Sequence, residues 1–264
     1  MALISLSTPG APAATSGVTG SVIAMSTALS PNTVRVRDIP ACRGWCEGGV
    51  LNTALSLAHT SNFGQSISAI GNNVDGSDAD GLAVNSTTGA LAGATSGLTL
   101  NGGGAGQGQL RHRPYLWCRY KLHSSLLGQN VFTGMITTPE NAASTEPPLA
   151  NEGVYVQIAD GVNGGRFRLG SKQAGIVATY VDTGVTAVVD RLYIVEISFD
   201  GTNLISVISD STSSVRTVHT GPFPPLTTAL LGGTSFCLAR ESNFSAQLGG
   251  VTVKFYGGGY EQDR

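Results

Sequence analysis

Charged residues are scarce in this chain. They make up 12% of its 264 residues, about half of the usual share of roughly 25%, and only three of them are lysines against twelve arginines. A helical bundle or coiled coil needs many Ala, Glu, Lys, Leu and Arg residues, so this composition excludes both. A dedicated nucleic-acid-binding protein needs a basic face, and a pI near 6.1 argues against this class. We therefore expect no nucleic-acid partner.

Long apolar runs are absent as well. No stretch approaches the length of a membrane-spanning helix, so we expect no membrane partner. The first residues contain neither the basic region nor the apolar run of a signal peptide, so we expect no secretory signal. The composition nevertheless does not match that of a disordered protein with few hydrophobic residues and a high net charge. In this chain 41% of the residues are hydrophobic and the formal net charge is only −2.

Cysteine and histidine are too few and too scattered to indicate a metal site. Cys42 and Cys46 are close in sequence, whereas Cys118 and Cys237 lie in apolar, strand-like runs. We interpret the cysteines as reduced thiols that pack as small hydrophobic residues, although the role of Cys42 and Cys46 stays open. The four histidines lack ligand spacing. We therefore expect no metal and no cofactor.

What the sequence does contain is a series of short, strand-like segments separated by Gly, Asn and Asp. Asn72-Asn73 and Asp182–Gly184 predict turns, and Asp200-Gly201 predicts a tight hairpin. Many short strands at regular spacing predict an all-β, antiparallel jelly-roll sandwich. The expected strands span residues 65–70, 81–85, 95–100, 115–122, 131–137, 153–159, 166–169, 176–181, 192–199, 204–209, 214–219, 235–239 and 251–256.

Two of these segments show a clear period of two, which is typical of a strand with one buried face. They span residues 115–122 and 192–199. The residues that this alternation directs into the core are Leu116, Cys118, Tyr120, Tyr193, Val195, Ile197 and Phe199.

The sequence divides into two parts. Residues 1–40 are small and mostly uncharged, with several prolines, and form an expected extended N-terminal arm; residues 41–264 form the expected sandwich. Such an arm cannot bury a core of its own, so it is either disordered or ordered against a neighbouring subunit. The apolar residues available for subunit or capsid contact are Val18, Val22, Ile23, Met25 and Leu29.

The order of strands and turns resembles that of concanavalin-like jelly-roll domains in structural proteins of tailed-phage virions. The segments that carry the resemblance are Tyr115–Ile136, Gly153–Ile158, Arg166–Leu169, Tyr180–Val185, Arg191–Gly201 and Gly250–Tyr256. The resemblance implies a role at the virion surface, as a capsid decoration protein, a head spike or part of a tail fibre. The same sandwich also serves lectins and glycosidases, so the fold alone does not fix the function.

One strand offers a possible surface-binding face. Arg113, Tyr115, Trp117 and Arg119, with Arg111 and Lys121, share the outward phase of the segment around residue 117. This pattern is consistent with a basic, aromatic platform for a sugar or an acidic partner. The alternative, which we favour, is a sheet face covered by another subunit or by loops.

The densest acidic segment is Asn73–Gly81. Its alternating oxygen side chains resemble a calcium loop, but Ala79 stands where a ligand is needed and no closing Glu follows. A turn in which Asp and Asn side chains bind their own backbone explains the segment equally well. Catalytic residues are not indicated, because the carboxylates on strands are isolated, whereas a retaining glycosidase needs a close pair.

The sequence therefore predicts a non-enzymatic bacteriophage structural protein that binds the outer head surface as a decoration or cement protein. Its expected partners are the major capsid protein and further copies of itself, in a trimer or else a dimer. It would be assembled in the host cytoplasm and located on the outer capsid surface of the virion. The alternative is a receptor-binding or tail-fibre module that recognises host surface glycans.

Overall fold

The computed structural model describes residues 20–24, 34–38, 42–47, 66–70, 72–88, 95–101, 110–123, 125–136, 152–224, 235–243 and 251–262. The chain forms two compact units, residues 1–41 with 263–264, and residues 42–262. In the first unit, β1 (Gly20–Ala24) pairs antiparallel with β2 (Val34–Asp38), and Val22 and Ile23 lie opposite Val36 and Arg35. The arm residues Val18, Met25 and Leu29 lie outside the described residues.

The described part of the second unit consists of strands, joined in places by single 3₁₀ turns. None of its helical segments has the length and apolarity to cross a membrane. The 3₁₀ turns are η2 (Leu110–His112) and η3 (Asn163–Gly165). The strands are β3 (Cys42–Glu47), β4 (Ser66–Ile70), β5 (Asn72–Asp78), β6 (Gly81–Thr87), β7 (Thr95–Asn101), β8 (Tyr115–His123), β9 (Gln129–Ile136), β10 (Gly153–Ala159), β11 (Arg166–Lys172), β12 (Thr179–Thr186), β13 (Leu192–Phe199), β14 (Leu204–Ser209), β15 (Ser214–His219), β16 (Ser235–Asn243) and β17 (Thr252–Gln262).

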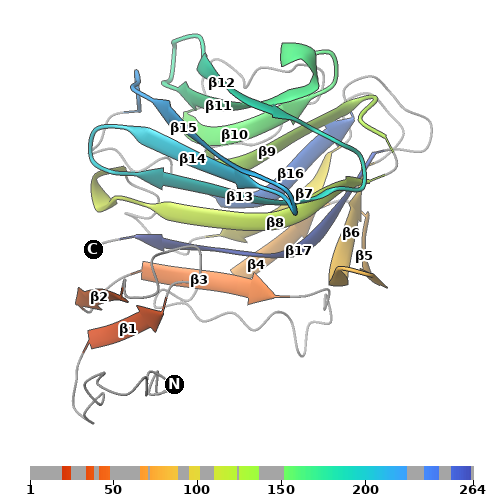
Figure 1. Cartoon of the computed structure of the whole chain (residues 1–264), viewed down its shortest axis with the longest axis horizontal. Helices are drawn as coiled ribbons and strands as arrows, with labels where there is room; N and C mark the ends of the chain where they lie inside the picture. The colour runs from red at the N-terminus through yellow and green to blue at the C-terminus, as the bar shows by residue number, and fades with distance from the viewer. Residues whose placement is uncertain are drawn as a thin grey trace. The chain divides into compact units, whose positions relative to one another are not determined.

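These strands form two antiparallel sheets (Figure 1). The seven-stranded sheet has the order β12-β11-β10-β9-β16-β7-β4. The eight-stranded sheet has the order β15-β14-β13-β8-β17-β6-β5, with β3 paired to β17 beside β6. Strand β17 changes partners along its length: its first residues pair with β6, and those after Tyr256 pair with β3. The expected all-β antiparallel sandwich is confirmed.

The apolar core lies between the two sheets, as the alternation in the sequence predicts. Phe167 on β11 and Tyr193 on β13 meet edge to face across the sandwich, with ring centroids 5.0 Å apart. The inward residues expected from the alternation are all buried: Leu116, Cys118, Tyr120, Tyr193, Val195, Ile197 and Phe199. The interpretation of Cys118 as a buried, reduced thiol is also confirmed.

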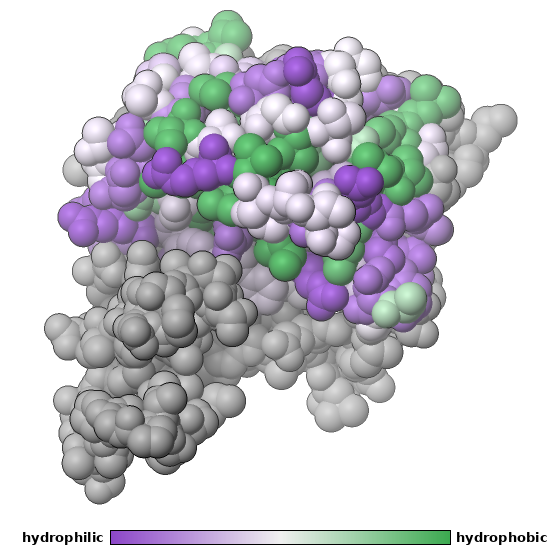
Figure 2. All heavy atoms as spheres, viewed as in Figure 1, coloured by the Kyte–Doolittle hydropathy of each residue, from purple (hydrophilic) through white to green (hydrophobic). Residues whose placement is uncertain are grey.

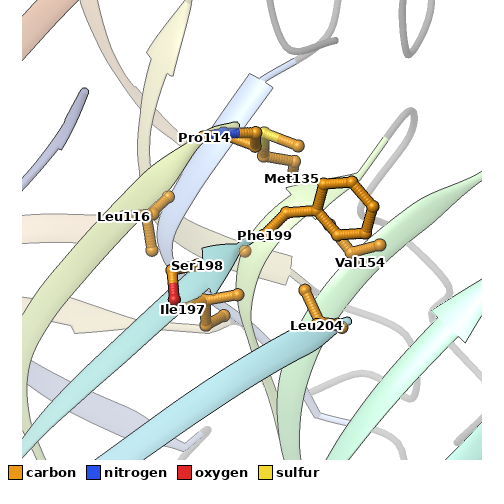
Figure 3. A pocket seen from close by; sticks show the side chains of 9 residues that line it. Pro114, Leu116, Met135, Val154, Ile197, Ser198, Phe199 and Leu204 are labelled. Carbon is orange, nitrogen blue, oxygen red and sulfur yellow. The ribbon is translucent and has the colours of Figure 1, made fainter. Parts of the chain in front are cut away.

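The core leaves only a small gap near the start of β8. Figure 3 shows its lining, in which Phe199 and Leu204 lie close to Met135 and Val154 of the other sheet. The void holds about 10 Å³, which is about the space of one water molecule, and its apolar lining offers a water no polar partners. This gap is a packing defect and not a binding site.

Two expected turns are in fact parts of strands. Asn72-Asn73 opens β5, which belongs to the eight-stranded sheet, whereas β4 before it belongs to the seven-stranded sheet. Asp182–Gly184 lies within β12, and the expected strand 176–181 is displaced to Thr179–Thr186. Between the pairs Arg168–Asp182 and Arg166–Thr186 the register shifts, so β12 bulges there. Gly184 has φ +75°, which a bulge tolerates as well as a turn does.

Candidate binding site

The outer face of the eight-stranded sheet carries most of the residues that the sequence singled out. Tyr115, Trp117 and Arg119 alternate with buried residues along β8 and are partly exposed. They lie opposite Ser198, Glu196 and Ile194 of β13, respectively. The Tyr115 hydroxyl donates a hydrogen bond to Glu196 Oε1 at 2.5 Å. These three β8 residues therefore lie on the same, outer face of the sheet.

Arg111 and Arg113 do not belong to this strand, contrary to the expectation. Arg111 lies in η2, and Arg113 follows it with φ +47° and donates its backbone N–H to the Leu110 carbonyl at 3.0 Å. This turn directs Leu110 into the core, and β8 begins only after Pro114. Pro114 is the sequence signal that favours a later start, because proline has no N–H for a strand ladder.

Lys121 also faces outward but is only 7% exposed, because two carboxylates surround it. Its Nζ lies 3.1 Å from Asp78 Oδ2 and also forms an ion pair with Asp80. Lys254 Nζ lies 3.3 Å from the same Asp78 oxygen, and the Tyr256 hydroxyl donates to it at 2.6 Å. We call these five residues the Asp78 cluster; it joins the β5–β6 hairpin to β8 and β17.

The electrostatics of the Asp78 cluster favour its charged form. Burial acts to raise the pKa of the Asp78 carboxyl, but hydrogen bonds from Tyr256, the Asp80 N–H, Lys121 and Lys254 outweigh it and hold this pKa well below its usual range. Burial likewise acts to lower the pKa of Lys121, and the two aspartates raise it above its ordinary value. The cluster is therefore a set of paired charges at neutral pH.

The Asp-rich segment Asn73–Gly81 lies mostly in strand β5, and only its end is a turn in which an Asp side chain binds its own backbone. Asp78 Oδ1 accepts the Asp80 backbone N–H at 2.9 Å and closes the β5–β6 hairpin, while Asp78 Oδ2 accepts from Lys121, Lys254 and Tyr256. Both oxygens are thus occupied. Among the described residues, no group of three or more His, Cys, Asp or Glu side chains is arranged to hold a metal ion.

Arg119 lies beside the Asp78 cluster and is held by neutral contacts. Its Nη2 donates to the Asp80 backbone carbonyl at 3.2 Å, and its Cζ lies 5.5 Å from the centroid of the Tyr256 ring. Tyr256 reaches this position because the register shifts between Phe255 and Gly257, where β17 has one residue more than β8. A bulge of this kind re-aims a side chain at a sheet surface.

A groove of about 590 Å³ opens next to Arg119. Its lining combines exposed apolar side chains, among them Val188 and Ile194 at 40% exposure each, with charged and hydroxyl groups. Figure 2 shows the same mixture on a wider scale, since apolar patches alternate with hydrophilic residues on the visible face. The lining residues are Asp80, Arg119, Val188, Val189, Asp190, Arg191, Leu192, Ile194, Ser209, Asp210 and Ser211.

The loops that border this groove are fixed by hydrogen bonds. The Asp190 backbone N–H donates to the Leu122 carbonyl at 2.8 Å, and the Val188 N–H donates to the Tyr193 hydroxyl at 2.9 Å. Asp210 accepts from the backbone of its own hairpin and pairs with Arg191 at 2.9 Å. Contacts within the chain therefore hold the borders of the groove in place.

The sequence prediction found Arg119 but missed the rest of this groove. Tyr115 and Trp117 share the face without lining the groove, and Arg113 lies apart from it. Asp190, Arg191 and Asp210 come from turns far along the chain. In the sequence, Asp190 and Asp210 could be noticed only as acidic residues at the start of polar turns. Such residues are common in hairpins, so they do not indicate a binding site.

The outer face of the seven-stranded sheet is the other surface with polar and aromatic side chains. Gln157 Nε2 donates to Asn130 Oδ1 at 2.6 Å, and Arg168 Nε donates to Gln157 Oε1 at 2.9 Å. The Arg168 guanidinium also stacks 3.6 Å from the centroid of the Tyr180 ring. Asn130 and Gln157 are fully buried, so this is a packed polar cluster and not an open site.

A buried Ser–His contact is the feature most similar to catalytic chemistry. Ser171 Oγ lies 2.9 Å from His219 Nε2 but donates its own proton to the Pro222 carbonyl at 2.6 Å. Ser171 and His219 are 1% and 4% exposed. A nucleophile must be reachable by substrate and hydrogen-bonded to its base as the donor, and this pair meets neither requirement.

Solved structures share this fold at low sequence identity. A protein of unknown function from Shewanella oneidensis MR-1 matches with a TM-score of 0.56 and 10% identity, over 86% of this chain and 89% of that chain. Lectin I from Ulex europaeus, in complex with the methyl glycoside of α-L-fucose, matches with a TM-score of 0.52 and 12% identity, over 84% and 98%. The binding domain of Paraclostridial Mosquitocidal Protein 1 matches with a TM-score of 0.51 and 8% identity, over 83% and 48%.

These matches define the class of the fold. No protein-family model matches the chain, and no curated protein matches it in sequence. At identities of 8–12% the similarity shows the fold alone. The chain thus has the β-sandwich fold found in lectins and in the binding domain of Paraclostridial Mosquitocidal Protein 1, which confirms the concanavalin-like part of the sequence resemblance. The virion part of that resemblance stays a prediction.

Proposed function

We propose that this protein is a non-enzymatic module that recognises glycans through the groove beside Arg119. The observation that carries the proposal is the composition of the groove, in which exposed apolar side chains lie among ordered charged and hydroxyl groups. A sugar ring has the matching character, with an apolar C–H face and a rim of hydroxyls. The volume of about 590 Å³ lies within the roughly 300–1,000 Å³ of typical small-ligand sites.

Two further features support the proposal. The groove is preorganised by backbone hydrogen bonds, such as that from the Asp190 N–H to the Leu122 carbonyl, and a preformed site loses less conformational entropy on binding. The fold is that of lectins, one of which was solved with a fucoside. A lectin fold alone does not establish sugar binding, so the groove is the stronger support.

The test is binding to an array of immobilised glycans, followed by calorimetry with the glycans that bind. Ile194→Lys places a long charged side chain in the groove at an exposed position. Val218→Lys makes the same kind of change at 37% exposure on β15, outside the groove lining. We expect Ile194→Lys to weaken glycan binding at least about tenfold and Val218→Lys to leave it unchanged. The proposal fails if no glycan binds, or if both variants bind as the wild type does.

Capsid decoration is a second proposal, and it concerns a different part of the chain. Residues 1–41 and 263–264 form a compact unit apart from residues 42–262, which is consistent with a separate attachment element. In this proposal the chain binds the major capsid protein on the phage head. Removal of residues 1–41 is expected to abolish that binding, while residues 42–262 stay folded. Unchanged occupancy on the heads would contradict this proposal.

A further inference from the structure

Around the groove, the cations Lys121, Lys254 and Arg191 each contact an aspartate carboxylate, and Arg119 does not. Lys121 and Lys254 contact Asp78, and Lys121 also contacts Asp80. Arg191 pairs with Asp210, and Asp190 contacts His123 Nδ1 at 2.5 Å. Among the groove-lining residues, all of which the structure describes, Arg119 is the cationic side chain that has no carboxylate partner.

Arg119 is oriented without being neutralised. Its contacts are a backbone carbonyl and an aromatic ring, and the carboxylate of the adjacent Asp80 is occupied by Lys121. A guanidinium has five N–H donors in a planar fork, and the carbonyl contact uses one of them. The remaining donors are suited to a carboxylate, which such a fork binds through two parallel hydrogen bonds.

The register of the strands places an apolar and a hydroxyl group in line with this cation. Arg119 of β8 lies opposite Ile194 of β13, and Ile194 lies opposite Ser209 of β14. Neighbouring strands are about 4.8 Å apart, so the three positions span about 10 Å across the groove. A sugar ring over Ile194 would direct a carboxylate toward Arg119 and a hydroxyl toward Ser209.

We infer that the groove selects acidic saccharides, with Arg119 as the partner of the sugar carboxylate and Ile194 as the platform for its ring. This inference rests on the proposed glycan-binding function and narrows it to one ligand class. A neutral sugar would leave the Arg119 charge without a partner, whereas a carboxylated sugar would form a charge-assisted, bidentate hydrogen-bond pair with it.

The experiment compares carboxylated glycans, both sialylated and uronic, with neutral glycans on one array. Each bound carboxylated glycan is then tested by calorimetry beside its methyl ester, which keeps the ring and removes the charge. Arg119→Gln removes the cation, and Arg119→Lys keeps the charge but loses the planar fork. Arg216→Gln is the matched control, because Arg216 is exposed on β15 of the same sheet and does not line the groove.

We expect the bound glycans to be carboxylated and their methyl esters to bind at least about tenfold more weakly. Arg119→Gln should cause a loss of the same size, Arg119→Lys a smaller one and Arg216→Gln none. Binding of neutral glycans that Ile194→Lys abolishes and Arg119→Gln leaves intact would overturn this inference while the proposed function stands. Absence of binding to any glycan would overturn both.

Discussion

The two faces of β8 are held in place by different kinds of interaction. Its inward residues Leu116, Cys118, Tyr120 and Leu122 are at most 2% exposed and contact apolar residues of both sheets. Its outward residues are partly exposed, or, like Lys121, buried by partners of opposite charge. The inward face gains stability from apolar burial, which requires no particular partner. The outward face depends on particular partners, which hold Lys121 and Arg119 beside the groove.

This difference predicts where a substitution is most harmful. Phe199 of β13 is 4% exposed and meets the Phe223 ring with centroids 5.3 Å apart. We expect Phe199→Ala to lower the free energy of unfolding by about 3–5 kcal/mol, because it removes apolar contacts and leaves a cavity next to the existing void. Denaturant titration measures this change. A loss below about 1 kcal/mol would show that the inward face is not what stabilises the sandwich.

The outward face should be sensitive to the loss of a single charge. We expect Asp78→Asn to lower the free energy of unfolding by about 2–3 kcal/mol, because Lys121 would lose an anionic hydrogen-bond partner in a largely buried position. The side-chain oxygen of Asn still accepts the Asp80 N–H, so the turn is retained.

The matched control for this change is Asp200→Asn. Asp200 accepts backbone N–H groups from Thr202 and Asn203 at 2.8 and 2.7 Å and is exposed. Among the described residues, no lysine or arginine hydrogen-bonds to its carboxylate, and Arg216 acts on it only through its charge. The loss should therefore stay below about 1 kcal/mol. Equal losses at Asp78 and Asp200 would mean that the Asp78 cluster acts only as a hairpin turn.

The same contrast explains which parts of the molecule were predictable from the sequence. Alternation is a local signal, so the inward residues of β8 and β13 followed directly from it. The partners of the outward face are distant in sequence: Lys121 and Asp78 are 43 residues apart, and Tyr256 and Asp78 are 178 apart. Their meeting depends on strand order and on the bulge at Tyr256, which no local pattern encodes. The prediction of a turn at Asp182–Gly184 was wrong for a related reason. Gly184 has a positive φ, which both a turn and a strand bulge can use, so the sequence alone does not distinguish them.

The smallest effect we expect comes from a polar residue on the inward face. His219 of β15 lies opposite the core residue Leu204, and its Nε2 lies 2.9 Å from Ser171 Oγ and 3.0 Å from Thr179 Oγ1 in the other sheet. The Gly221 N–H donates to Nδ1 at 3.3 Å, so the neutral ring fits this site with its proton on Nε2. Among the described residues, the hydrogen-bond and ring contacts of His219 are uncharged, including the Phe223 ring at 5.6 Å.

Burial lowers the pKa of His219 below its ordinary value of 6.5. The unfolded chain therefore takes up a proton at a higher pH than the folded chain does. The contribution of this group to stability is fully present above about pH 6.5 and is lost as the pH falls from there to the folded-state pKa. Urea titrations of the wild type at pH 7.5 and pH 5.5 should show lower stability at pH 5.5, and His219→Gln should reduce that difference. If the variant keeps the whole pH dependence, another group causes it, and the hydrogen bonds of His219 between the sheets do not depend on the neutral ring.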